Sequence, residues 1–274
     1  MVHGAWLIGL GLMLGAVGTL IGAGGGFVLV PVLLLLYPHA SPELITSVSL
    51  AVVFLNALSG SWAYGRMKRI DRRSGLFFAA ATIPGAIAGA LTTSLIPRRL
   101  FNAVFGLMLI AVAIYLLLQR TRATPHLPGH GKGQTTRRLV EANGTVHVFS
   151  FNLRLGMLLS VLVGYLSSLL GIGGGIVHVP ALVRLLNFPV HIATATSHFI
   201  LAIMALTGTL IHIANGSFAH GGVRETLYLG LGVVPGAQVG AALSGRVRGA
   251  WIIRSLAIAL AFVGLRILML AVQT

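Results

Sequence analysis

Long hydrophobic runs separated by short polar segments make up most of the sequence. These runs lie at roughly 4–36, 44–65, 75–96, 99–118, 153–186, 192–215, 223–244 and 250–272. About 20 apolar residues are enough for a helix to cross a bilayer. A membrane β-barrel would instead show apolar and polar residues in alternation over segments of about ten residues. The pattern therefore predicts an all-α polytopic membrane protein.

The two halves of the chain resemble each other. LIGAGGGFVLVP from Leu20 pairs with LLGIGGGIVHVP from Leu169, LSGSWAY from Leu58 with LTGTLIH from Leu206, and IPGAIAGAL from Ile83 with VPGAQVGAA from Val234. Matches in the same order indicate a duplication, as in many secondary transporters. We expect residues 1–118 to form a first transmembrane repeat and 153–274 a second. Between them, the polar, Pro/Gly-rich segment 119–152 is expected to be a flexible cytoplasmic linker.

The distribution of Lys and Arg predicts how the repeats are oriented. Segment 66–74 and the linker are rich in basic residues, as is 246–254, whereas 215–222 has none. Cytoplasmic loops carry an excess of Lys and Arg, so corresponding loops of the two halves face opposite sides and the repeats are inverted. This orientation requires runs 4–36 and 153–186 each to enter and leave the membrane on the same side. Each run is then expected to contain two half-helices that meet at its glycines.

The first run of each half is interrupted by an unusual motif. Four glycines fall within five residues, and a proline follows five residues later, at Pro31 and at Pro180. In lipid, a broken helix needs partners for its freed backbone groups, and the start of the next helix offers N–H groups to an anion. We therefore expect substrate contacts at Gly24, Gly25, Gly26, Gly173, Gly174 and Gly175. Close helix packing through small residues is the alternative.

The formal charge of +15 comes from 19 Lys and Arg against four Asp and Glu. The basic residues lie mostly at the ends of hydrophobic runs, which indicates topology and anionic headgroups rather than nucleic acid. The acidic residues lie in or beside predicted loops, which argues against a cation or metal site. The chain has no cysteine and no Gly-Lys-Ser/Thr phosphate loop, so no metal or other cofactor is expected.

Polar side chains inside hydrophobic runs are further candidates for substrate contact. These are Ser49, Ser197, Asn56, Gln238, His178 and His198, with Thr46, Ser47, Thr194, Thr196, His212 and Arg184 nearby in the sequence. Hydroxyl and amide groups can donate hydrogen bonds to an oxyanion, and histidine can pair with an anion or relay a proton. The alternatives are also open: hydroxyls bond to their own helix, amides clamp helices, histidines serve structure, and an arginine anchors topology.

These motifs resemble those of the TauE/SafE sulfite-exporter-like family. The resemblance rests on GAGGGFVLVP and GIGGGIVHVP, on TSVSL from Thr46 and TATSH from Thr194, and on the PGA motifs at Pro84 and Pro235. It covers nearly the whole chain except the central linker. Membership would imply a multi-pass protein of the cell inner membrane that carries sulfite, sulfonates, or other sulfur-containing or organic anions.

The sequence thus predicts a secondary transporter for a small anion, which works by alternating access at the interface of the repeats. An anion channel, or a carrier for a different solute, is the alternative. An intramembrane serine enzyme built on Ser59 and His212 is a weaker candidate, because Ser59 aligns with Thr207 of the other repeat. No catalytic residue is therefore expected. The expected partners are the anion and the lipid bilayer, and the oligomeric state is left open.

Overall fold

The computed structural model describes residues 2–118, 134–219, 221–245 and 249–273. The first half forms α1 Val2–Ile21, α2 Gly26–Leu36, α3 Pro42–Arg66, α4 Arg72–Thr93 and α5 Arg98–Leu118. The second half forms α6 Leu153–Leu170, α7 Gly175–Arg184, α8 Val190–Ala214, α9 Val223–Leu243 and α10 Gly249–Gln273. Two strands, β1 Gln134–Val140 and β2 Val146–Asn152, lie between the halves.

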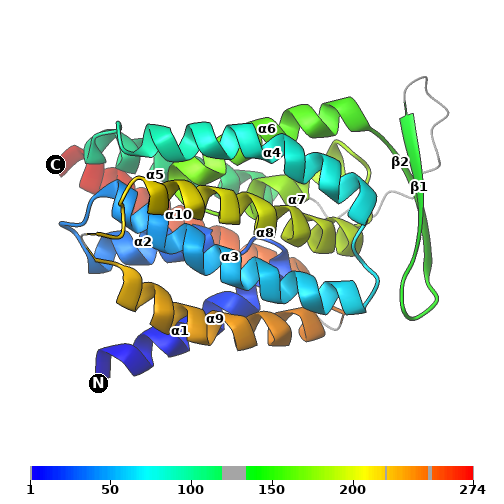
Figure 1. The fold of residues 1–274 in the computed structure, drawn as a ribbon, viewed down its shortest axis with the longest axis horizontal. Coiled ribbons are helices and arrows are strands. Elements are labelled where there is room, and N and C mark those ends of the chain that lie inside the picture. Colours follow the sequence, from blue (N-terminus) through cyan, green and yellow to red (C-terminus); the bar gives the residue numbers. More distant parts are fainter. Residues whose placement is uncertain (1, 119–133, 220, 246–248, 274) are drawn as a thin grey trace.

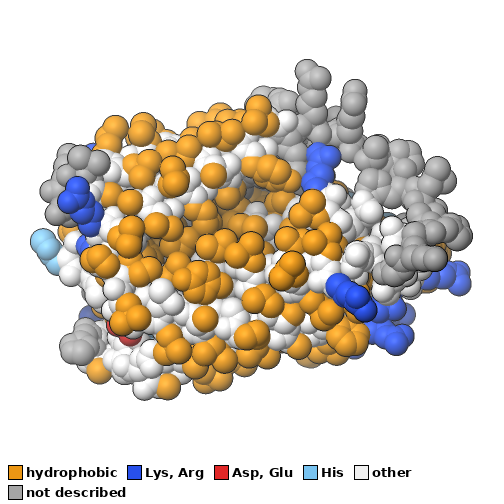
Figure 2. Space-filling view, turned by 90° about the horizontal axis from the view of Figure 1, so that it is seen from above, with side chains coloured by type: hydrophobic (Ala, Val, Ile, Leu, Met, Phe, Trp, Pro, Cys, Tyr) orange, Lys and Arg blue, Asp and Glu red, His pale blue; other side chains and the backbone are white. Residues whose placement is uncertain are grey.

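The outer surface is suited to a bilayer. Within the described residues, seven helices are long and apolar enough to cross a membrane: α1, α3, α4, α5, α6, α8 and α9. Hydrophobic side chains cover the middle of the molecule, while Lys and Arg gather toward its two ends (Figure 2). Exposed Trp62, Leu107 and Leu158 belong to this apolar belt. The predicted class, an all-α polytopic membrane protein, is confirmed.

Corresponding helices of the two halves make corresponding contacts. Helix α1 packs along α9, and its counterpart α6 packs along α4, while α3 packs on α8 and α5 on α10 (Figure 1). Glycine allows the first two pairs to approach closely. A Cβ at Gly85 of α4 would lie 2.1 Å from the carbonyl oxygen of Val161, and a Cβ at Gly236 of α9 would lie 2.3 Å from that of Leu12. Both pairs therefore require glycine at their contact.

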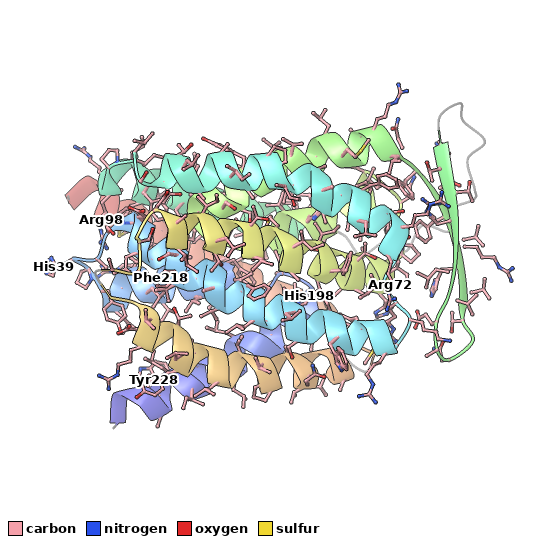
Figure 3. The ribbon with its side chains drawn as sticks, in the orientation of Figure 1. His39, Arg72, Arg98, His198, Phe218 and Tyr228 are labelled. Atoms are coloured by element: carbon pink, nitrogen blue, oxygen red, sulfur yellow. The ribbon has the colours of Figure 1, made fainter. Side chains whose placement is uncertain are left out.

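The helices run between two ends of the molecule. The β-hairpin and the α3–α4 loop lie at the right in Figure 1, here called the hairpin end. His39 in the α2–α3 loop and Phe218 in the α8–α9 loop lie at the left in Figure 3, here called the distal end. The chain also begins at the distal end, so α1 and α2 both extend from that end toward the interior.

The broken segments differ from the two half-helices that we expected. Helix α1 has 20 residues and α2 has 11. At 1.5 Å per residue, these correspond to about 30 Å and about 16 Å. The break therefore divides the segment unequally, since α1 is long enough to cross a bilayer by itself. The second repeat follows the same plan, with 18 residues in α6 and 10 in α7.

Part of the linker is ordered, contrary to the expectation of a flexible loop. Strands β1 and β2 pair as an antiparallel hairpin, with Arg137 opposite Phe149. Their buried face carries Phe149 and Phe151, which contact Phe188 in the α7–α8 loop with ring centroids 4.5 and 4.9 Å apart. Phe78 of α4 joins this aromatic group. The hairpin is thus packed against both repeats.

Ion pairs fix the polar edge of the hairpin. Glu141 accepts a 2.8 Å hydrogen bond from Nε of Arg69, which follows α3, and lies 2.8 Å from Nε2 of His147. Arg137 Nε lies 3.7 Å from a carboxylate oxygen of Asp71. Burial alone would raise the pKa of Glu141, but the hydrogen bonds and charges of Arg69 and His147 outweigh it and hold the pKa below its ordinary value. Basic residues used to predict orientation at Arg120, Arg122, Lys132, Arg246 and Arg248 lie outside the described residues.

Candidate transport site

The two glycine motifs, far apart in the sequence, meet inside the molecule. A Cβ at Gly26, the first residue of α2, would lie 2.7 Å from the carbonyl oxygen of Gly171. Reciprocally, a Cβ at Gly175, the first residue of α7, would lie 2.3 Å from the carbonyl oxygen of Gly22. Only glycine permits this approach of backbone to backbone. Each helix start therefore rests against the break of the other repeat, and we call this contact the crossing.

Helices α3 and α8 hold the crossing through aligned serines. The Ser49 hydroxyl donates to the carbonyl of Gly171 at 2.6 Å, and the Ser197 hydroxyl donates to that of Gly22 at 3.4 Å. Val53 of α3 lies beside Gly173. Both serines are fully buried. Ser49 and Ser197, predicted as substrate contacts, lie at the breaks, and in this structure their hydroxyls donate to backbone carbonyls.

A connected polar network surrounds the first break. Asn56 donates from Nδ2 to the carbonyl of Gly24 at 2.8 Å and accepts from the Thr19 hydroxyl at 2.8 Å. Nε2 of His198 lies 3.2 Å from that hydroxyl, and Tyr64 donates to the Thr19 carbonyl at 2.8 Å. Figure 3 shows His198 within the helical bundle. Asn56 and His198, predicted separately, thus belong to one buried network.

The second break lacks this network. By the alignment of the repeats, the counterparts of Thr19, Asn56, His198 and Tyr64 are Ser168, Met204, Leu50 and His212. The contacts agree with this alignment: Gly60 lies against His198 and Thr19, and Gly208 lies against Leu50 and Ser168. The positions of Asn56 and His198, which are polar at the first break, are apolar at the second break, where they hold Met204 and Leu50. As a result, the Ser168 hydroxyl and Nε2 of His212 are buried without a hydrogen-bond partner.

Three buried hydroxyl groups without partners gather around the second break: those of Thr46, Ser167 and Ser168. Each side chain is fully buried. Thr46 lies against Gly171, Ser167 against Gly174 with its oxygen 2.9 Å from a Cβ built there, and Ser168 against Gly208. We call these residues the hydroxyl cluster. Buried polar groups are usually paired, so a cluster of unpaired ones beside a helix start is suited to bind a polar ligand.

Gln238 and His178 lie in other surroundings. The amide of Gln238 donates to the carbonyl and hydroxyl oxygens of Ser59, both at 2.8 Å, on an exposed side of the α3–α9 contact. It therefore clamps two helices. Nε2 of His178 lies 3.3 Å from the Ser160 hydroxyl, and its ring lies beside Phe78. Among the described residues, no group of three or more His, Cys, Asp or Glu is placed to hold a metal ion.

A cavity of about 780 Å³ opens between α5 and α7. It begins at Ile176 and Val177, directly after the glycine motif, and extends to Arg184 and Leu185 at the end of α7. Its other wall includes Val112 and Tyr115 of α5. The lining is mostly apolar. The cavity thus leads along α7 from the second break toward the hairpin end, with a guanidinium group at its far limit.

The fold and site define a multi-pass helical membrane protein with two broken segments packed against each other at its centre. The sequence model of the family described as "Sulfite exporter TauE/SafE" matches residues 7–267. The chain therefore belongs to this family of membrane transporters, which are not enzymes, as its motifs indicated. No solved structure matches the chain.

Curated relatives are described as transporters as well. The chain is 34% identical to "Probable membrane transporter protein YunE" of Bacillus subtilis, with 96% of each chain covered. It is 26% identical to "Probable membrane transporter protein MJ0441" of Methanocaldococcus jannaschii, with 76% of this chain and 71% of the relative covered. A "Probable membrane transporter protein" of Xylella fastidiosa is 30% identical over 74% of this chain and 71% of its own length. The predicted location, a multi-pass protein in the cell membrane, is confirmed.

Sequence reasoning did not identify Thr19, Ser167 or Ser168 as site residues. A signal for the serines was present, because Ser167-Ser168 directly precedes Leu169-Leu170 and the second glycine motif. Their importance depends on what surrounds them. A hydroxyl in a hydrophobic run bonds to its own helix in many proteins, and only tertiary packing shows which ones have not done so.

Proposed function

We propose that this transporter is a secondary carrier of a small anion and that the hydroxyl cluster, with the start of α7, binds the anion. The observation that carries the proposal is the absence of partners for the buried hydroxyls of Thr46, Ser167 and Ser168. Three hydroxyl donors provide hydrogen bonds, and the start of α7 adds the positive end of a helix dipole, without a formal charge. We call this site the anion seat. It binds the anion strongly enough to select it and weakly enough to release it.

The anion is of the sulfite or sulfonate kind in this proposal. An oxyanion with three oxygens can accept from several hydroxyl and N–H donors at once. The family description names sulfite, and the resemblance extends over nearly the whole chain. At the first break, Asn56 and Nε2 of His198 are both bonded to the Thr19 hydroxyl. These residues of the first break form a rigid wall of the site, and the second break provides the anion seat.

The two repeats are inverted in this proposal, with residues 1–118 and 153–274 as the bundles and the hairpin end in the cytoplasm. Arg69, Arg72 and Arg73 lie at that end, as the positive-inside rule requires. Helices α1 and α2 extend from the distal end, whereas α6 follows the hairpin. Movement of the helices around the crossing would expose the seat to each side in turn. The α5–α7 cavity would form the route to the cytoplasm.

Flux into liposomes that contain the purified protein tests this function. Sulfite, thiosulfate, sulfate, methanesulfonate and succinate are compared, with protein-free liposomes as the control. A carrier gives saturable uptake of one or a few of these anions and exchanges internal for external anion. Uptake that rises linearly with concentration and shows no exchange would instead support the channel. If folded, inserted protein moves none of the five, the assignment of an anion is wrong.

A further inference from the structure

A line of polar side chains runs from the distal end toward the hydroxyl cluster. Glu43, in the first turn of α3, accepts a 2.7 Å hydrogen bond from the hydroxyl of Ser217 in the α8–α9 loop. The same hydroxyl lies 3.3 Å from Nδ1 of His212, in the last turn of α8. Glu43 is half-buried, whereas His212 is fully buried. A carboxylate near the surface is thus joined to an imidazole in the interior through one hydroxyl.

The direction of these hydrogen bonds fixes the tautomer of His212. An ionised carboxylate only accepts, so the Ser217 proton points to Glu43. The Ser217 oxygen is then the acceptor for His212, which must carry its proton on Nδ1. Nε2 is therefore unprotonated, and it is buried without a hydrogen-bond partner. A nitrogen with a free lone pair thus lies on the side of the ring away from Glu43.

The same face of α8 leads to the hydroxyl cluster. Gly208 and His212 are four residues apart in a helix and so share a face. A Cβ at Gly208 would lie 3.1 Å from the hydroxyl oxygen of Ser168. In the first repeat, the positions that correspond to His212 and Ser168 hold Tyr64 and Thr19, and the Tyr64 hydroxyl donates to the backbone carbonyl of Thr19. The second repeat has an imidazole in place of the phenol and leaves the bond unmade.

We propose that Glu43, Ser217 and His212 form a proton pathway that couples anion transport to the proton gradient, with His212 as the proton-binding residue. This inference rests on the proposed anion seat. A proton that binds Nε2 is balanced by transfer of the Nδ1 proton to Ser217 and of the Ser217 proton to Glu43. The products are neutral His212 with its proton on Nε2, intact Ser217 and a neutral Glu43 carboxyl group. In the reverse direction, the neutral Glu43 gives its proton to Ser217, and Ser217 gives a proton to the free Nδ1 of His212. The products are His212 with protons on both nitrogens and an ionised Glu43, and loss of the Nε2 proton then completes delivery from the distal side to the interior.

The geometry favours symport rather than exchange of proton for anion. A protonated His212 would present its Nε2–H toward the hydroxyl cluster, where it adds a charge-assisted donor for the anion. Anion and proton then bind together and each strengthens the binding of the other. Among the described residues, Glu43 is the charged group that faces His212. Other charged groups at the distal end are engaged separately: Arg98 with the Ala40 carbonyl, and Arg224 and Glu225 beside Tyr37.

The test measures accumulation of anion in liposomes driven by a pH gradient alone. The panel anion with the largest saturable flux is the probe, and the membrane potential is held at zero with valinomycin and equal K⁺. One proton per anion gives about a tenfold accumulation for each unit of pH difference, with the anion concentrated on the alkaline side. Glu43→Gln and His212→Gln should reduce this ratio to near one. Exchange of anion at equal pH, which needs no net proton movement, should remain.

Matched variants separate coupling from folding. Glu225→Gln removes another half-buried carboxylate at the distal end, and His39→Gln removes another imidazole there; both should keep the full accumulation ratio. Ser217→Ala interrupts the pathway, whereas Ser217→Thr retains a hydroxyl and should retain coupling. Accumulation that is unchanged in Glu43→Gln and His212→Gln, or absent in the wild type despite saturable exchange, overturns the pathway but leaves the carrier intact. Absence of both flux and exchange overturns the carrier and the pathway with it.

Discussion

The hydroxyl of Ser49 donates a 2.6 Å hydrogen bond to the carbonyl oxygen of Gly171, which lies in the break of the opposite repeat. The equivalent bond from Ser197 to Gly22 is longer, at 3.4 Å. The crossing is therefore fixed more firmly on the side of the second break. This is also the side on which hydroxyl groups remain without partners.

Replacement of Ser49 by alanine should destabilise the folded protein by about 1–3 kcal/mol, because it leaves the buried Gly171 carbonyl without a donor. Ser197→Ala removes a weaker bond and should cost less. Thermal unfolding in detergent, followed by circular dichroism, gives the order of the two variants. Equal or reversed effects would mean that the difference in bond length does not reflect a difference in strength.

Ser168→Ala should weaken anion binding and leave stability nearly unchanged. The hydroxyl has no protein partner, so its removal should leave the unfolding temperature nearly unchanged. Loss of one hydrogen bond to a charged ligand costs about 1.5–3 kcal/mol, so the KM for the transported anion should rise by about tenfold or more. Ser94→Ala, at an exposed helix end, is the control. A lower unfolding temperature with an unchanged KM would give Ser168 a structural role.

Gly175→Ala should abolish transport and lower stability. The new Cβ would lie 2.3 Å from the Gly22 carbonyl oxygen and 2.6 Å from the Cα of Ala23, and backbone on both sides prevents relief. At Gly9 of α1 a Cβ would meet nothing within 4 Å, so Gly9→Ala should be neutral or slightly stabilising. Flux and unfolding temperature are measured for both. An active, stable Gly175→Ala protein would show that the repeats do not need this close approach.

Asn56→Met and His198→Leu introduce the residues of the other repeat into the first network. Each should cost about 1–3 kcal/mol, because each leaves buried hydrogen-bonding groups unpaired around Thr19. Together they should cost less than the sum, since both belong to one network. A double-mutant cycle on the unfolding free energy measures the difference. Strict additivity would indicate that Asn56 and His198 act independently.

The docking of the hairpin should weaken in acid. The pKa of Glu141 is lowered in the folded protein, so its contribution is fully present above the ordinary value of 4.5 and is lost as the pH falls through the lower folded value. The chain has no cysteine, so spin labels at Asn143→Cys and Arg73→Cys are unique. The distance distribution between them should broaden below about pH 4.5. In Glu141→Gln it should already be broad at neutral pH and change little with acid.

The duplication and the two breaks could be predicted from the sequence because they are costly in lipid. Glycines and a proline inside a hydrophobic run disrupt a helix. Their repetition at Gly22–Pro31 and Gly171–Pro180 indicates that both breaks serve the same purpose. These features depend on local rules that a single sequence displays.

The hairpin and the unequal division of the broken segments could not be predicted in the same way. Residues 134–152 contain many polar side chains, and the alternation that buries Phe149 and Phe151 is short. Their order depends on Phe188, which is distant in the sequence. Likewise, Ser168 and Thr19 are aligned and chemically similar. Only the neighbours, Met204 in one case and Asn56 in the other, decide which hydroxyl is left unpaired.

The hairpin has a consequence for the energetics of a transport cycle. It contacts the first repeat through Arg69 and the second through Phe188, and it does so at one end of the molecule only. In the transport cycle that we propose, opening of that end requires the hairpin to leave at least one of these partners, whereas opening of the distal end does not. The two half-cycles therefore differ in free energy even though the repeats share a fold. The carrier that we propose would therefore rest preferentially with its hairpin end shut, and its outward-facing and inward-facing states would differ in population.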